Sequence, residues 1–234
     1  MAFLQPGPAR QPALQAPAIV LWLIALLLAA HGARTLLLDP AASTDIIIAY
    51  AFIPVRYAFP GDLWEKAIPF LSHVFLHGDW PHVILNSLWL LAFGPIVARR
   101  FGGALFIVFF LVCGVAGAAA YLLFNWGSPE PVVGASGAVS GLMAAGLRLM
   151  PGLFYWAMPG ETRLAPILSR PILTFSLAWA ALNVAFGMIG AGFLGSDGAI
   201  AWQAHLGGYL AGLLLAGPFD FLRPRELAPS LGDG

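Results

Sequence analysis

The chain has 234 residues, of which 60% are hydrophobic and only 9% are charged, and its formal net charge is zero. Soluble domains carry roughly 25% charged residues, so this composition excludes an ordinary water-soluble fold. A mean hydropathy of +0.85 and several apolar runs of about 20 residues predict a multi-pass protein of the lipid bilayer. The Lys and Arg residues form no run, which leaves a nucleic-acid partner without electrostatic support.

The apolar runs predict an all-α membrane protein: one bundle of six transmembrane helices with a partly embedded loop after the first helix. The expected spans cover residues 18–38, 82–99, 103–124, 136–150, 172–189 and 202–219. Residues 1–17 are expected to form a flexible tail, 18–219 the membrane domain and 220–234 a short cytoplasmic tail. The single cysteine, Cys113, excludes an internal disulfide and is interpreted as core packing.

The first apolar run carries His31 and Arg34 near its end and is longer than the apolar core of a secretory signal, which has about 7 to 15 residues. It is therefore predicted to be a membrane span and not a cleaved leader. The connection over residues 39–81 contains many aromatic residues, which settle at the membrane interface. We expect this connection to be ordered and partly embedded.

The distribution of basic residues predicts the orientation. If the N-terminus is cytoplasmic, eight basic residues lie on the inner side and two or three on the outer side, as the positive-inside rule requires. The inner set is Arg10, Arg99, Arg100, Arg148, Arg163, Arg170, Arg223 and Arg225, and the outer set is Arg56 and Lys66, with Arg34 near the outer end of the first span. We expect a bacterial plasma-membrane protein with both termini in the cytoplasm.

This orientation gives four polar side chains a common depth. The spans that begin near residues 82, 136 and 202 all run from outside to inside, so their first turns lie in the outer part of the membrane. The residues concerned are His82, Asn86, Ser136 and His205. Because ionisable groups inside a span are expensive and usually functional, the sequence predicts a reactive site towards the outer side.

Ser136 follows a Gly-Ala turn and opens a span that ends before Pro151. A helix of this length reaches about 22 Å, short of the roughly 30 Å hydrocarbon core, so Ser136 is expected below the outer surface. There it receives the positive end of the helix dipole and free backbone N–H groups. Such donors stabilise an oxyanion.

Small residues are expected to bring Ser136 and His205 together. Gly137 and Gly141 follow Ser136, and Gly208 and Gly212 follow His205 in a GxxxG arrangement, so the two helices can approach closely. Docking of these faces would put the serine oxygen and the imidazole about 2.6 to 3.2 Å apart, the distance that activates a nucleophile. The alternative is an ordinary small-residue contact, because 27 glycines make chance matches frequent.

His82 and Asn86 are four residues apart and share one helix face. Their N–H groups could add oxyanion contacts; the alternative is interhelical hydrogen bonding. No Asp or Glu lies in the spans near His205, which favours a Ser-His dyad over a triad, and Asn183 is interpreted as an interhelical contact. His73, His77 and His82 have no convincing fourth ligand for zinc, so we predict no metal and no cofactor and expect His73 and His77 to brace the loop.

Three ordered motifs, SHVFLHGDWPHVILN over 72–86, GASG over 134–137 and AHLGGYLAG over 204–212, together resemble the rhomboid family of intramembrane serine proteases. The resemblance covers the whole predicted bundle. It implies that Ser136 is the nucleophile, that His205 is the general base, and that His82, Asn86 and the Ser136 N–H line the oxyanion hole. The implied substrates are single-span or multi-span membrane proteins.

Two positions depart from the family pattern. Many relatives carry an aromatic residue four positions after the serine that packs on the catalytic histidine, whereas this chain has Ser140. The frequent Trp-Arg pair of the first loop is Trp64-Glu65 here. Two other classes remain open: an inactive rhomboid-like protein that binds transmembrane segments, and a transporter, which would show a continuous polar path and repeated halves.

Overall fold

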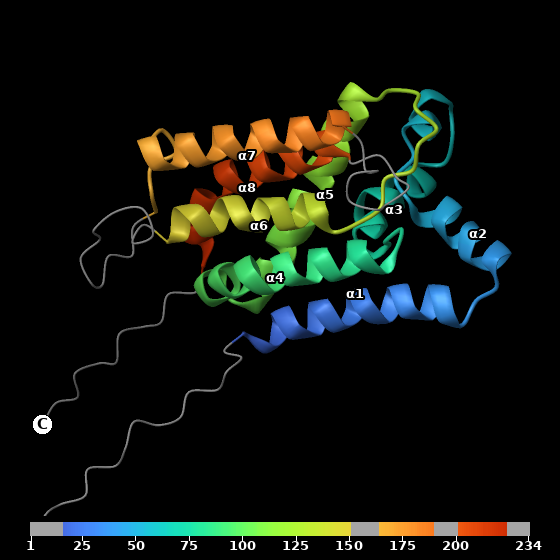
Figure 1. Cartoon of the computed structure of the whole chain (residues 1–234), viewed down its shortest axis with the longest axis horizontal. Coiled ribbons are helices and arrows are strands. Elements are labelled where there is room, and N and C mark those ends of the chain that lie inside the picture. Colours follow the sequence, from blue (N-terminus) through green and yellow to red (C-terminus); the bar gives the residue numbers. More distant parts are fainter. Residues whose placement is uncertain (1–15, 151–163, 190–200, 224–234) are drawn as a thin grey trace, which may run out of the picture.

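The computed structural model describes residues 16–150, 164–189 and 201–223. Six long or central helices pack side by side as a bundle (Figure 1). They are α1 (Ala18–Leu36), α4 (Trp80–Phe101), α5 (Gly103–Phe124), α6 (Ser136–Leu149), α7 (Arg170–Ile189) and α8 (Trp202–Leu222). The all-α six-helix membrane bundle predicted from the sequence is confirmed. The predicted tail over residues 1–17 lies largely outside the described residues, as does most of the predicted tail over 220–234.

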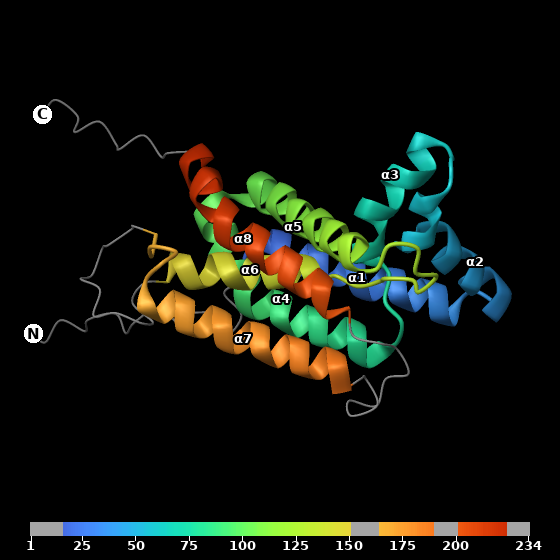
Figure 2. The same cartoon turned by 90° about the horizontal axis from the view of Figure 1, so that it is seen from above.

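Helix α6 lies in the middle of the bundle in both views (Figures 1 and 2). Nearly all of its residues are buried, including Leu142, Ala144 and Ala145, which are fully inaccessible. Within the described ranges, four helices are long and apolar enough to cross a membrane: α1, α4, α5 and most of α7. Helix α6 has only 14 residues, about 21 Å of helix. Because protein surrounds it, α6 needs neither the length nor the apolar surface of a lipid-facing span.

The six helices alternate in direction. Helices α4, α6 and α8 begin at the end of the bundle that carries α2 and α3, and α1, α5 and α7 finish there (Figure 2). At the opposite end, Asp220 of α8 accepts hydrogen bonds from Arg100 of α4, at 2.5 Å, and from Arg223, at 3.1 Å. This ion-pair cluster joins the last turns of α4 and α8.

The connection after α1, expected as a partly embedded loop, contains two α-helices and two 3-10 turns. It contains α2 (Pro40–Tyr50), the 3-10 turn η1 (Pro54–Ala58), α3 (Leu63–Ser72) and the turn η2 (His73–Phe75). The Asp39 carboxylate accepts the Ala42 N–H ahead of α2, and the Asp62 carboxylate accepts two N–H groups of α3. Both aspartates satisfy backbone donors that a helix start otherwise leaves free.

A short backbone pairing ties this connection to the chain ahead of α6. Phe52 and Val132 exchange two hydrogen bonds, with N–O distances of 3.0 and 2.8 Å. The Phe52 ring is fully buried and packs against Tyr57 and Phe70, at centroid distances of 5.0 and 4.7 Å. The segment that leads into Ser136 is therefore held by the loop after α1.

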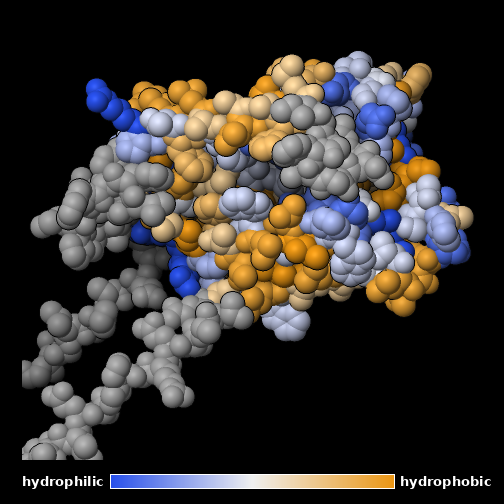
Figure 3. Space-filling model, in the orientation of Figure 1, coloured by the Kyte–Doolittle hydropathy of each residue, from blue (hydrophilic) through white to orange (hydrophobic). Residues whose placement is uncertain are grey.

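The surface fits a lipid environment. Apolar side chains gather over the helices, and hydrophilic ones gather at the two ends (Figure 3). Trp22, Leu177 and Met188 are 70–80% exposed although they are apolar, as expected of side chains that face hydrocarbon.

The helix bounds differ slightly from those predicted. Helix α4 begins at Trp80, two residues early, because the Asp79 carboxylate accepts the His82 N–H at 2.7 Å and Pro81 fits the first turn. Helix α8 continues to Leu222, beyond the expected end at 219.

Candidate active site

The chain enters α6 through a turn that only glycine accommodates well. Gly134 has a φ of +117°, and a Cβ there would lie 2.6 Å from His82 Nε2. The Gly134 N–H donates to His73 O at 2.9 Å, and the Ala135 N–H lies 3.4 Å from His77 Nε2. His73 and His77 therefore brace the turn, His77 with its ring nitrogen and His73 with its carbonyl.

Ser136 is the first residue of α6, and its hydroxyl lies 2.8 Å from Nε2 of His205, in the first turn of α8. This distance falls in the range for nucleophile activation. The residue ahead of α6, Ala135, makes no side-chain hydrogen bond that would cap the helix. Its first N–H groups and the positive end of its dipole thus point to the space beside Ser136.

Glycine faces allow this approach of α6 and α8. A Cβ on Gly208 would lie 1.9 Å from Gly137 O, and a Cβ on Gly212 would lie 2.1 Å from Gly141 O. Both distances are far below van der Waals contact, so the two backbones touch. A Cβ on Gly141 would also lie 2.4 Å from the sulfur of buried Cys113 on α5. The four glycines singled out in the sequence thus lie where three helices meet.

His82 and Asn86 face the Gly134 turn from α4. A Cβ on Gly134 would lie 3.5 Å from Asn86 Nδ2 as well as close to His82. Asn86 is 4% exposed, and within the described part of the chain its Nδ2 has no hydrogen-bond partner. A buried amide donor without a partner costs free energy. This donor is therefore available to an oxygen atom bound at the turn.

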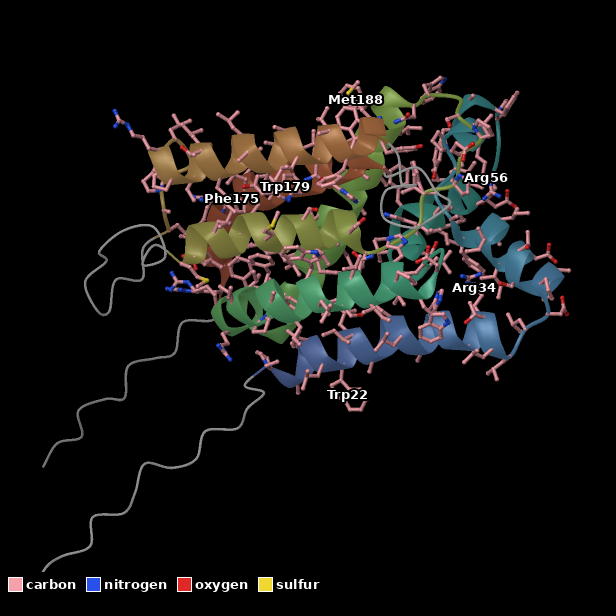
Figure 4. All side chains as sticks on the ribbon, in the orientation of Figure 1. Trp22, Arg34, Arg56, Phe175, Trp179 and Met188 are labelled. Carbon is pink, nitrogen blue, oxygen red and sulfur yellow. The ribbon has the colours of Figure 1, made fainter. Side chains whose placement is uncertain are left out.

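Asn183 of α7 adds a contact to His205. Its Oδ1 lies 2.9 Å from His205 Nδ1. The sequence predicts an interhelical contact at Asn183 but does not identify its partner. The available sequence signal was the spacing of Ser176 and Asn183, which are seven residues apart and so share one helix face. In the structure this face is the less exposed one, with Ile172, Phe175, Ser176, Trp179 and Asn183. Figure 4 shows Phe175 and Trp179 on that side of α7 and Met188 pointing away.

A second polar cluster joins α1 to the loop and to the start of α4. The His31 ring packs edge-on against Trp80, the first residue of α4, at a centroid distance of 4.8 Å, and Arg34 donates to His77 O in the loop at 2.6 Å. Figure 4 shows Arg34 at the loop end of α1. In the described ranges, no group of three His, Cys, Asp or Glu residues is arranged to hold a metal ion. The His73 ring instead bonds Pro69 O at 2.8 Å.

Burial keeps the two loop histidines neutral. It lowers the pKa of His73 to about 4, and burial together with the nearby His82 and His31 lowers the pKa of His77 to about 3. A neutral imidazole has one ring nitrogen that accepts hydrogen bonds. His77 Nε2 can therefore accept from the Ala135 N–H ahead of Ser136.

The fold and these contacts define a class: a multi-pass α-helical membrane protein with a serine and a histidine in contact between two helices. A family model described as the Rhomboid domain matches residues 60–219. The chain belongs to the rhomboid family.

The relatives agree with this assignment. Rhomboid protease GluP of Bacillus subtilis is 26% identical over 176 residues, which is 75% of this chain and 30% of GluP. YdcA of the same bacterium is 32% identical over 162 residues, 67% of each protein. RHOMBOID-like protein 9 of Arabidopsis thaliana is 36% identical over 87 residues, 37% of this chain and 18% of that protein. The chain thus spans less than a third of the length of GluP and of the Arabidopsis relative.

Proposed function

We propose that the protein is an intramembrane serine endopeptidase that cleaves membrane-protein substrates with Ser136 and His205. The observation that carries the proposal is the 2.8 Å contact of Ser136 Oγ with His205 Nε2 inside the helical bundle. Membership of a family that includes named proteases supports the same reaction class.

The chemistry follows from the atoms in contact. Ser136 Oγ attacks the carbonyl carbon of a substrate peptide bond, and His205 Nε2 takes the hydroxyl proton. His205 then gives this proton to the leaving amine as the C–N bond breaks, which leaves an acyl ester on Ser136. Water, deprotonated by His205, hydrolyses the ester and regenerates the serine. No step requires a metal or a cofactor.

The negative oxygen of the tetrahedral intermediate needs donors. The backbone N–H of Ser136 lies at the start of α6. Asn86 Nδ2, which has no hydrogen-bond partner among the described residues, and the ring of His82 lie around the same turn. We assign these three groups to the oxyanion hole, because pre-positioned donors of this kind are a large part of acyl-transfer catalysis.

We also propose that the site faces the outer side of a bacterial plasma membrane and that both termini are cytoplasmic. Arg99, Arg100, Arg148 and Arg170 lie at the end of the bundle opposite to Ser136 and His205. That end is assigned to the cytoplasm by the positive-inside rule.

Mutation of the dyad tests the proposal. Purified protein in detergent is incubated with a single-span membrane substrate, and cleavage is followed on gels. Ser136→Ala and His205→Ala should each abolish cleavage and leave a folded, membrane-extracted protein. Ser140→Ala is the matched control: it removes a buried hydroxyl one turn further along α6 and should retain cleavage.

A fluorophosphonate probe separates this proposal from the non-catalytic alternative. The probe reacts with an activated serine, so wild type should be labelled and Ser136→Ala should not. A wild-type protein that binds transmembrane segments without labelling or cleavage would be an inactive rhomboid-like binder. Turnover that persists in Ser136→Ala would remove the proposed nucleophile.

A further inference from the structure

Two contacts of Asn183 determine which of its side-chain atoms faces His205. Asn183 Nδ2 lies 2.9 Å from the backbone carbonyl of Trp179, and a carbonyl oxygen can only accept. The amide nitrogen must therefore face Trp179, which leaves Oδ1 facing His205 Nδ1 at 2.9 Å. An amide oxygen can only accept as well, so the proton of neutral His205 lies on Nδ1.

This tautomer leaves Nε2 of His205 free to accept a proton. With the proton on Nδ1, Nε2 carries a lone pair, and it is Nε2 that lies 2.8 Å from Ser136 Oγ. In the opposite tautomer Nε2 would carry a hydrogen and could not take the serine proton. Asn183 thus occupies the place that a carboxylate holds in a Ser-His-Asp triad.

The packing of α7 on α8 sets the position of Asn183 along the axis of α8. One turn further into the bundle, the Trp179 and Tyr209 rings stack at 4.4 Å with an interplanar angle of 18°. The Tyr209 hydroxyl also lies 2.8 Å from Ser176 Oγ. Since α7 and α8 are antiparallel, Asn183 and His205 form the next pair towards the active-site end. The α7–α8 contact therefore holds Asn183 level with His205.

Three considerations favour a role of Asn183 in positioning His205. The residue four positions after the nucleophile is Ser140, which supplies no ring to pack on His205. An asparagine also suits the position, because a third member inside a membrane costs less free energy when neutral than when charged. When His205 takes the serine proton, its Nδ1–H bond to Asn183 becomes charge-assisted and stronger.

We propose that Asn183 is the positioning residue of the dyad: it holds His205 in the Nδ1–H tautomer with Nε2 aimed at Ser136. This inference rests on the proposed protease function. It adds a residue of α7 to a site otherwise built from α4, α6 and α8.

The test uses Asn183→Ala, Asn183→Asp and the matched control Ser176→Ala, which removes the hydrogen bond of Ser176 with Tyr209 between α7 and α8. Three quantities are measured on the full chain in detergent: the rate of fluorophosphonate labelling of Ser136, and kcat and KM for a single-span substrate. Loss of one neutral hydrogen bond is commonly worth about tenfold. Asn183→Ala should therefore label and turn over about tenfold more slowly, or slower still, with KM little changed.

Asn183→Asp keeps an acceptor of the same size and should restore labelling towards wild type. Ser176→Ala should lower stability with little change in labelling. Equal labelling of Asn183→Ala and wild type would overturn the inference, and so would equal losses in Asn183→Ala and Ser176→Ala, which would assign the effect to helix attachment. If wild type itself is not labelled, the protease proposal and the inference both fail.

Nitrogen-15 NMR of histidine-labelled wild type tests the tautomer without relying on a variant at Asn183. The His205 signal is assigned as the one missing in His205→Gln. The expected pattern is a protonated Nδ1 and an unprotonated Nε2. A neutral His205 protonated on Nε2 would overturn the inference even if the Asn183 variants do not fold.

Discussion

Asn86 is buried, and its Nδ2 has no partner in the described part of the chain, so a catalytic role and a structural role predict different effects of its removal. If Nδ2 stabilises the oxyanion, Asn86→Ala should lower kcat by about 10²–10³-fold, equivalent to about 2.7–4 kcal/mol. The loss of stability should be small, because an interhelical hydrogen bond in a membrane averages about 0.6 kcal/mol and this donor has no partner among the described residues. Turnover and melting temperature measured in one detergent check both numbers.

Ser87 provides the control for Asn86. It is the next residue of α4 and is also buried, but its hydroxyl donates to Val83 O within the helix at 2.7 Å. Ser87→Ala should leave kcat near wild type. Near-normal turnover of Asn86→Ala together with a large loss of stability would assign Asn86 to packing and leave the oxyanion to backbone donors.

His73 and His77 make stability depend on pH. Their folded pKa values, about 4 and about 3, lie below the value of about 6.5 for an exposed histidine. As the pH falls below about 6.5, the unfolded state therefore binds more protons than the folded state. Stability is fully present above about pH 6.5 and is lost progressively below it, by up to about 2 kcal/mol for each histidine at pH 5.

Replacement of His77 by glutamine tests this origin. His77→Gln keeps a hydrogen-bond acceptor for the Ala135 N–H but does not titrate. Its melting temperature should fall less than that of wild type between pH 7.5 and pH 5. A variant that loses as much stability as wild type over this range would show that other groups cause the acid sensitivity.

The residues of the site differ in how far the sequence could reveal them. The sequence could group Ser136, His205, His82 and Asn86 as one candidate site because they are polar positions near the starts of apolar helices that share one depth. The partner of Asn183 was not predictable, because it depends on the rotation of α7 relative to α8. The polar residues Ser176 and Asn183 indicate which face of α7 is inward, whereas apolar residues such as Leu177 are exposed. This pattern does not set the rotation, which comes from contacts such as Trp179 with Tyr209.

At the scale of helices, the contact of α6 with α8 leaves no room for a side chain at Gly208. A Cβ there would lie 1.9 Å from Gly137 O, a backbone atom that cannot move aside. Overpacking usually costs about 1–3 kcal/mol, and we expect Gly208→Ala to reach at least the upper end of this range. It should also separate Ser136 from His205 and slow fluorophosphonate labelling.

Gly217→Ala is the matched control on the same helix. A Cβ at Gly217 would meet its nearest atoms, from Arg148 and Leu164, at 4.0 Å, an ordinary contact distance. Melting temperature and labelling should stay near wild type. If Gly208→Ala were as stable and reactive as Gly217→Ala, the close approach of α6 and α8 would not be needed for the site.

The helices show where sequence patterns succeed. Length and apolar composition indicate the long helices within a few residues, because hydrocarbon imposes both. Helices α2 and α3 were missed although Asp39 with Pro40, and Asp62, are good start signals. Both helices are short, and α2 has no buried residue, so no clear core-facing pattern marks them.

For the whole molecule, the two ends of the bundle have different roles. The end with α2, α3, Ser136 and His205 holds the Gly134 turn, the proposed oxyanion donors and the loop that braces the turn. The opposite end holds the Arg100–Asp220–Arg223 cluster. A site at one end of the bundle would meet substrates from one side of the membrane, so orientation decides where cleavage happens.

Orientation is tested with single cysteines in a Cys113→Ala background, because Cys113 is the only native cysteine. Glu130 is exposed in the connection before α6, at the active-site end, and Leu168 is 79% exposed ahead of α7, at the other end. The excess of basic residues at the second end assigns it to the cytoplasm. An impermeant maleimide added to sealed cells should therefore label Glu130→Cys and not Leu168→Cys. Permeabilised cells should label both, which shows that Leu168→Cys is reactive. Labelling of Leu168→Cys alone in sealed cells would invert the topology and place the active site on the cytoplasmic side.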